Sequence, residues 1–146
     1  MKIKRHASRA CELNPEDSGT LHLLGRWCYS LASVTWIERK TASALFSTPP
    51  SSSYEEALQY FLKASEVRSL ADLVPFRRRP PPFQLDDTFA KNHIFVGDCY
   101  VALKKLGQAK SWYKKALDVP LNPKYASDVA THQEAESKYN KYKNAS

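Results

Sequence analysis

The side chains most able to do chemistry in this sequence are its histidines and a short run of serines. His6, His22, His93 and His132 stand far apart and form none of the short-spaced pairs that bind zinc from a helix. Ser51–Ser53 lack the Gly-x-Ser-x-Gly context of a hydrolase nucleophile, and the sequence has no glycine-rich phosphate loop. We therefore expect no enzymatic activity, no catalytic residue, no cofactor and no metal site.

The cysteines Cys11, Cys28 and Cys99 are the other reactive side chains. Their number is odd, no two are spaced as Cys-x-x-Cys, and each falls inside a stretch that is predicted to be helix interior. Free cysteine is among the most buried residue types, and reduced thiols are typical of cytosolic and nuclear proteins. We expect buried, reduced cysteines.

Positive charge is concentrated in one part of the chain. The net charge is +7, and residues 90–124 hold seven lysines and two aspartates, which is +5 of that total. A proline-rich stretch that cannot pack into a helical core adds three consecutive arginines. Two interpretations stay open: a solvated helix surface beside a basic loop, or a landing site for an acidic partner such as nucleic acid, an anionic membrane or the acidic tails of tubulin. The candidate residues for acidic-partner binding are Arg77, Arg78, Arg79, Lys104, Lys105, Lys110, Lys114 and Lys115.

Two short helices within residues 93–120 must position these lysines. A small residue on the first helix, Gly97, and another on the second, Ala109, allow a close approach, while tyrosines on both helices fill the space between them. We place the end of the first helix and the start of the turn at Leu106–Gly107. This pattern resembles the tetratricopeptide repeat, in which such helix pairs stack on their neighbours.

An earlier unit follows the same pattern with a longer connection. Gly25 takes the small position of its first helix, and Ala57, Phe61 and Ala64 repeat the spacing of the second helix. About twenty residues more than the repeat allows separate the two halves. We predict an all-α protein in which antiparallel helix pairs of tetratricopeptide-like repeats form a short right-handed solenoid, with a helical insertion in the first full repeat and a C-terminal capping helix.

The 146 residues are predicted to form a single helical-repeat domain. Its divisions are 1–15 as the remnant of a repeat, 16–69 as a repeat with an insertion at 34–53, 70–87 as an Arg/Pro-rich loop, 88–121 as a second repeat, and 122–146 as a capping helix. No secretory signal is visible, and no apolar run reaches the ~20 residues that a membrane helix needs. We expect a soluble protein.

Local signals predict where the helices begin and end. A first helix is expected from about Lys2 to Leu13, and the helix that contains Phe61 should continue to about Arg68. Side chains that cap helices, and prolines that start them, mark the other boundaries. The expected helix starts are at Asn14, Ser53, Asp86 or Asp87, and Asn122-Pro123.

Three features of the sequence resemble the regulator of microtubule dynamics family. They are the run LLGRWCY at Leu23–Tyr29, Trp36, and the loop with Pro49-Pro50 between the halves of the first full repeat. The resemblance implies a cytosolic tetratricopeptide-like protein that associates with microtubules and spindle poles and supports chromosome segregation. One relative in the family is anchored on mitochondria and tethers the endoplasmic reticulum, and its repeat domain handles phospholipids.

The same resemblance implies a concave groove lined from the first helix of each pair. We expect a cytoplasmic protein on the cytoskeleton, spindle and spindle poles that contacts tubulin through its basic residues, with no nucleic acid partner and no membrane span. A phospholipid-binding or transfer module, with anionic phospholipid as ligand, and a generic peptide-binding scaffold are the alternatives that stay open. The predicted groove residues are His22, Arg26, Tyr29, Lys91, Ile94, Asp98 and Val101.

Overall fold

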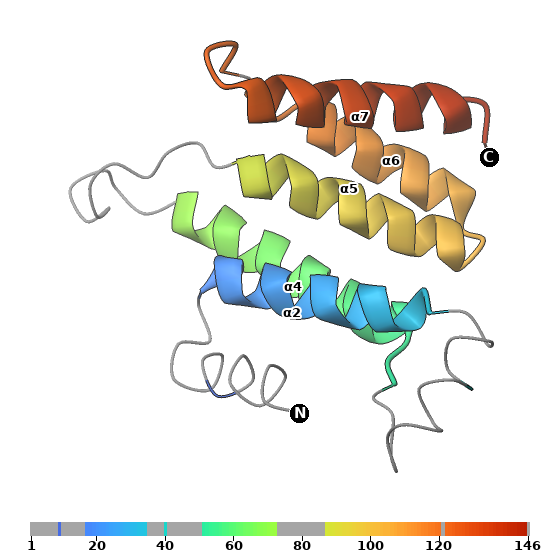
Figure 1. Cartoon of the computed structure of the whole chain (residues 1–146). Coiled ribbons are helices and arrows are strands. Elements are labelled where there is room, and N and C mark those ends of the chain that lie inside the picture. The colour runs from blue at the N-terminus through green and yellow to red at the C-terminus, as the bar shows by residue number, and fades with distance from the viewer. Residues whose placement is uncertain are drawn as a thin grey trace.

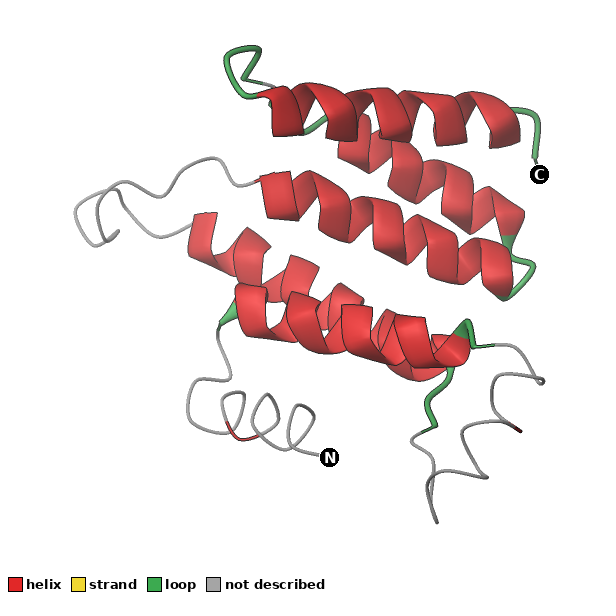
Figure 2. Ribbon diagram, viewed as in Figure 1, coloured by secondary structure: helices red, strands yellow, loops and turns green. Residues whose placement is uncertain are grey.

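The computed structural model describes residues 9, 17–34, 40, 51–72, 87–120 and 122–145. Helices and short connections make up this part of the chain, and it contains no strand (Figure 2). The predicted all-α class is therefore confirmed. Most of the helix expected over residues 2–13, most of the insertion at 34–53 and most of the loop at 70–87 lie outside the described residues. The helices with defined bounds are α2 (Ser18–Ala32), α4 (Tyr54–Asp72), α5 (Asp87–Ala102), α6 (Leu106–Leu117) and α7 (Ala126–Tyr142).

The helices stack in the order of the chain, and successive helices run in opposite directions (Figure 1). α2 packs on α4, α4 on α5, α5 on α6, and α6 on α7. α5 also contacts α2 and α7, so it touches each of the other four described helices. Because of this central place, side chains on α5 connect the first helix pair to the rest of the molecule.

Each helix pair is held close by a glycine that faces an aromatic ring. A Cβ atom added at Gly25 on α2 would lie 2.6 Å from the ring of Phe61 on α4. One added at Gly97 on α5 would lie 2.5 Å from the ring of Tyr113 on α6. Atoms this close overlap, so only glycine fits at either position without a shift of the ring. The predicted close approach at Gly97 and Gly25 is confirmed.

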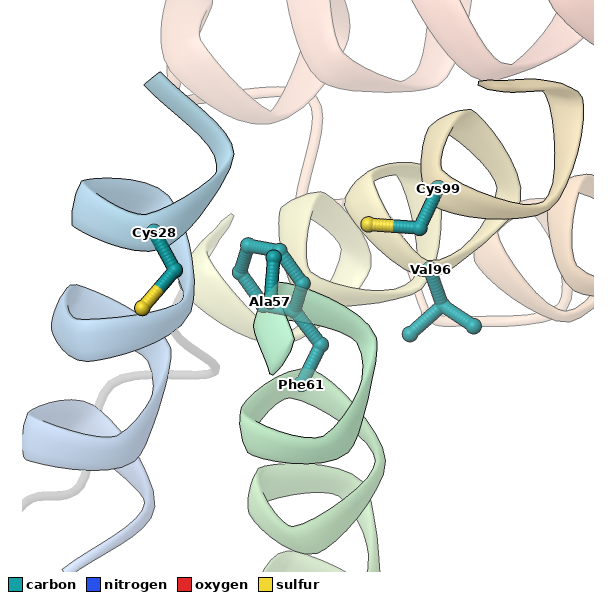
Figure 3. Close-up of a cluster of buried hydrophobic side chains, with 5 residues drawn as sticks. All are labelled: Cys28, Ala57, Phe61, Val96 and Cys99. Atoms are coloured by element: carbon teal, nitrogen blue, oxygen red, sulfur yellow. The ribbon is translucent and has the colours of Figure 1, made fainter. Parts of the chain in front are cut away.

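The buried residues form two apolar clusters. The first joins α2, α4 and α5 and includes Cys28 and Cys99, which are buried as predicted (Figure 3). Cys11 lies outside the described residues. The second joins α5, α6 and α7. The alanines at the repeat positions of α4 and α6 are buried beside the aromatic rings. The first cluster consists of Cys28, Ala57, Phe61, Val96 and Cys99, and the second of Ile94, Ala109, Tyr113, Ala116 and Ala135.

Side-chain caps fix the starts of α2 and α4. The Asp17 carboxylate accepts hydrogen bonds from the backbone N–H groups of Gly19 and Thr20, both at 3.2 Å, so Asp17 is the N-cap of α2. The prediction that Asn14 caps this helix is wrong, because the helix begins only at Ser18. The negative charge of the Asp17 carboxylate also interacts favourably with the positive end of the helix dipole. The predicted start at Ser53 is confirmed, since its hydroxyl accepts a hydrogen bond from the Glu56 N–H at 3.1 Å.

The turn between α5 and α6 begins earlier than predicted. α5 ends at Ala102, and Leu106 and Gly107 are the first two residues of α6, not the end of the helix before it. Lys104 takes the left-handed conformation with a φ of 60°. The N–H of Lys105 bonds to the carbonyl of Tyr100 at 2.8 Å, and that of Lys104 to the carbonyl of Val101 at 2.9 Å. These are the two bonds of a Schellman cap, with a lysine where glycine is usual.

The start of α7 also differs from the prediction. Asn122-Pro123 forms a turn, in which the Asn122 side chain accepts a hydrogen bond from the Lys124 N–H at 3.1 Å. The helix itself begins at Ala126, and Tyr125 is its N-cap residue.

The end of α4 also differs from the prediction. This helix continues to Asp72, four residues beyond the predicted Arg68.

We predict that Gly97→Ala lowers the free energy of unfolding by about 1–2 kcal/mol, because overlap with the Tyr113 ring outweighs the better helix propensity of alanine. Gly107→Ala is the matched control, because it makes the same change in the first turn of the next helix, away from the Tyr113 contact of Gly97. This control should change the stability by less than about 1 kcal/mol in either direction. Urea denaturation followed by circular dichroism measures both values, and an equally stable Gly97→Ala protein would contradict the close contact.

We also predict that Lys104→Gly raises the free energy of unfolding by about 1 kcal/mol, because glycine adopts positive φ without the steric cost that lysine meets. Lys104→Ala separates this effect from the loss of charge, since alanine retains a Cβ atom. It should leave the unfolding midpoint in urea close to that of the parent protein. A similar gain from both substitutions would show that charge, and not backbone conformation, limits stability at this turn.

Candidate functional site

The predicted basic residues of the second helix pair lie on α6 and on the turn that precedes it. Lys104 and Lys105 lie in the turn, and Lys110 and Lys114 are one helical turn apart on α6. Lys104, Lys105 and Lys114 are exposed, and their side chains make no ion pair or hydrogen bond with the described residues. These three ammonium groups are therefore available to an acidic partner. The predicted arginines at 77–79 lie outside the described residues.

The other two predicted lysines have structural contacts as well as charge. The ammonium group of Lys110 donates hydrogen bonds to the carbonyls of Ala145, at 2.7 Å, and Lys143, at 3.3 Å. It therefore ties the segment after α7 to α6. The ammonium group of Lys115 lies 3.8 Å from the centre of the Trp112 ring, which is a cation–π contact.

Among the predicted groove residues, Arg26 and Tyr29 share an aromatic surface between α2 and α5. The Tyr29 ring lies 5.4 Å from that of Tyr54 and 5.5 Å from that of Phe95. The Arg26 guanidinium lies 5.8 Å from the Phe95 ring centre. Burial, and then the charge of Asp98, raise the pKa of Tyr29 to about 12, so its hydroxyl stays protonated near neutral pH. We name the set of Arg26, Tyr29, Tyr54 and Phe95 the aromatic surface.

His22 and Ile94 are buried, contrary to the prediction that they line an open groove. His22 is 6% exposed, and Ile94 is 2% exposed within the second apolar cluster. Two further predicted groove residues, Lys91 and Val101, are half-buried on α5. The structure thus brings Arg26 and Tyr29 together and places His22 and Ile94 in the interior.

Instead of lining a groove, His22 joins α2 to α5 through Asn92. Its Nδ1 atom lies 2.9 Å from the Asn92 side-chain oxygen. The Asn92 amide donates to the Phe61 carbonyl at 2.9 Å and to the Ser65 hydroxyl at 2.8 Å, both on α4. Because the oxygen of Asn92 can only accept, the His22 Nδ1–H is the donor. This buried network satisfies polar groups from three helices, and no local pattern predicts it, because His22 and Asn92 are 70 residues apart.

The groove residue Asp98 is held by two other helices. Its carboxylate accepts a hydrogen bond from the Tyr113 hydroxyl at 2.7 Å and pairs with the Lys138 ammonium group at 2.6 Å. Lys138 also pairs with Glu134 at 3.2 Å. Burial, followed by the hydrogen bond to Asp98, raises the pKa of Tyr113 above its usual range. Asp98 therefore fastens α6 and α7 to α5 and has little capacity left for a ligand.

The described residues offer no group of three or more His, Cys, Asp or Glu side chains that could hold a metal ion. The thiol of Cys99 is buried, and burial together with the charge of Asp98 raises its pKa to about 12, so it is a poor nucleophile. No helix in the described part of the chain combines the length and the apolar character needed to cross a membrane. What the geometry supports is recognition by charge and by aromatic contact.

A family model described as "Regulator of microtubule dynamics protein 1-3" matches residues 1–71. Similar proteins extend the match through α5 and α6. Regulator of microtubule dynamics protein 1 of Mus musculus is 38% identical over 129 residues, which is 88% of this chain and 37% of that protein. The Homo sapiens protein 1 is 37% identical over the same length. Regulator of microtubule dynamics protein 3 of Xenopus laevis is 39% identical over 119 residues, or 81% of this chain and 22% of that protein.

This chain belongs to the regulator of microtubule dynamics family. The resemblance carried by the LLGRWCY run and the loop between repeat halves is thereby confirmed. The chain spans 37% of the length of the mouse protein 1 and 22% of that of the frog protein 3. Within the family match at residues 1–71, α2 and α4 supply Gly25 and Phe61, and thus the first of the two glycine–aromatic contacts.

We predict that Asp98→Ala lowers the free energy of unfolding by about 2–3 kcal/mol, because it leaves the Tyr113 hydroxyl and the Lys138 ammonium group without their shared partner. Lys138→Met should cost only about 1 kcal/mol, since Asp98 then still accepts from Tyr113. Lys141→Met, at an exposed position of the same helix, is the control and should shift stability by less than about 0.5 kcal/mol. Equal unfolding midpoints in urea for Asp98→Ala and Lys141→Met would show that this contact does not hold α7.

Proposed function

We propose that this chain is a non-enzymatic helical-repeat binding module that associates with microtubules or the mitotic spindle through its basic surface. The observation that carries the proposal is the set of three exposed lysines, Lys104, Lys105 and Lys114, which meet no acidic side chain among the described residues. The names of the related proteins, which call them regulators of microtubule dynamics, support a partner in the microtubule system. Tubulin, whose tails are acidic, is the partner we propose.

The architecture we propose is a short right-handed solenoid of tetratricopeptide-like repeats. The support for it is the recurrence of one contact: Gly25 against Phe61 in the pair α2–α4, and Gly97 against Tyr113 in the pair α5–α6. α7 would be the capping helix, since only Thr131 and Ala135 of this helix are buried. A solenoid of this kind leaves long, open surfaces on which a partner can lie.

The mechanism we propose is long-range electrostatic attraction followed by short contacts. Five ammonium groups on one turn and one helix create a positive field, and the acidic tails of tubulin would neutralise it. Such attraction falls off within about 10 Å at 0.1 M salt, so binding should weaken as salt is added. The arginines at 77–79 carry the same charge in the sequence and are part of the proposed surface. A cytoplasmic location on the cytoskeleton, spindle and spindle poles follows from this proposal.

A peptide-binding scaffold is the second candidate, and the aromatic surface favours it. Rings from α2, α4 and α5 meet there beside the exposed Arg26, which is a combination that binds anionic peptide groups in many proteins. The phospholipid-handling alternative depends on an apolar pocket beside Trp36, which lies outside the described residues. No specific observation favours it over the other two.

We predict that Lys104→Gln, Lys105→Gln and Lys114→Gln, combined in one protein, weaken binding to microtubules about tenfold or more and reduce its salt dependence. The control protein carries Lys63→Gln, Lys141→Gln and Lys143→Gln, which remove the same charge from exposed positions elsewhere. Co-pelleting with stabilised microtubules across a salt series gives the affinities, and circular dichroism confirms that helicity is retained.

Removal of the acidic tubulin tails should abolish the difference between the parent protein and the Lys104, Lys105 and Lys114 variant. An equal loss of affinity in the control protein would mean that total charge alone drives association. Unchanged affinity in the first variant would refute the basic surface as the contact.

A further inference from the structure

A pocket of about 370 Å³ lies where α4, α5 and α6 meet. Its volume falls in the range of about 300–1,000 Å³ that is usual for small-molecule sites. The pocket is separate from the aromatic surface. His93 lines the pocket, whereas Phe95 contacts Tyr29 in the aromatic surface, and residues two apart on a helix point to nearly opposite sides. The lining residues that matter below are Leu62 and Glu66 from α4, Phe89 and His93 from α5, and Trp112 and Lys115 from α6.

The wall of the pocket is aromatic. The imidazole of His93 lies 4.5 Å from the Phe89 ring and 5.3 Å from the Trp112 ring, measured between ring centres. Leu62 adds an aliphatic side. Rings arranged in this way offer a surface that suits a flat or branched apolar group.

The histidine in this wall is uncharged at neutral pH. Burial lowers the pKa of His93 to about 4, against the smaller effect of a hydrogen bond with the Lys115 backbone. Its Nδ1 atom is buried and has no hydrogen-bond partner among the described residues.

Two opposite charges line the same pocket without meeting. Glu66 on α4 and Lys115 on α6 are both exposed, and neither makes an ion pair with a described residue. The Lys115 ammonium group rests on the Trp112 ring at 3.8 Å, at the edge of the aromatic wall. An anionic ligand would therefore meet the unfavourable charge of Glu66, and a cationic ligand that of Lys115. A ligand with both charges would satisfy each of them.

We propose that this pocket binds a small zwitterion with an apolar or aromatic body, such as a free amino acid with a large hydrophobic side chain. Its ammonium group would pair with Glu66 and its carboxylate with Lys115, while its body lies against Phe89, His93 and Trp112. The ligand would then link α4 to α6 across α5. This site shares Lys115 with the basic surface proposed for microtubules but takes a different ligand, and it calls for no reaction.

The test uses three probes that share a phenyl ring and differ in their charged groups: L-phenylalanine, 3-phenylpropanoate, which lacks the ammonium group, and 2-phenylethylamine, which lacks the carboxylate. Each is titrated at pH 7 into the ¹⁵N-labelled chain while the indole N–H signal of Trp112 is followed by NMR. Trp112→Phe assigns that signal. We expect L-phenylalanine to bind about fivefold more tightly than either of the other probes, as one added ion pair would give. Equal affinities, or no shift of the Trp112 signal by any probe, would overturn the proposal.

Two substitutions assign the charges. Glu66→Gln should reduce the affinity for L-phenylalanine to that for 3-phenylpropanoate, and Lys115→Gln should reduce it to that for 2-phenylethylamine. Glu55→Gln and Lys63→Gln remove the same charges from exposed positions on α4 outside the pocket and should leave the affinities as they were. An equal loss from the controls would show that the probe responds to total charge and would refute the site.

Discussion

The contact between a glycine on one helix and an aromatic ring on the next sets the geometry of this protein. Because Gly25 and Gly97 have no side chain, Phe61 and Tyr113 can lie directly on the neighbouring backbone, and each helix pair closes tightly. Phe61 then stacks on Phe95 at 5.2 Å between ring centres, which carries the packing from the first pair into the second. The aromatic surface and the pocket thus lie on opposite sides of α5, the helix that this packing fixes in place.

The sequence predicted the parts of the fold that depend on local spacing and missed those that depend on distant partners. Small and aromatic residues recur at fixed intervals along each helix, so both pairs could be recognised from their spacing alone. The cap at Lys104 could not, because lysine carries no preference for positive φ and Gly107, three residues later, is the more usual choice. Tertiary packing decided where the turn begins, and local propensity did not.

The candidate site shows the same division. Repeat register placed Arg26 and Tyr29 on one side of α2, and both do belong to the aromatic surface. Register could not show that His22 points inward, because the hydrogen bond that holds it there is made with Asn92 on another helix. Nor could it show that Asp98 is occupied by Tyr113 and Lys138. A polar residue's neighbours decide whether it binds a ligand or holds the fold, and those neighbours are distant in sequence.

Lys115 belongs both to the basic surface proposed for microtubules and to the pocket proposed for a zwitterion. The two sites can therefore work together only if a ligand in the pocket leaves the charge of the basic surface largely unchanged. A zwitterion adds no net charge, so its arrival in the pocket would leave the long-range field of the five lysines almost unchanged. An anionic ligand at the same place would cancel part of that field and weaken attraction to an acidic partner. The presence of Glu66 in the pocket selects against such an anion. The same carboxylate that gives the pocket its preference for a zwitterion therefore also keeps the basic surface available to an acidic partner.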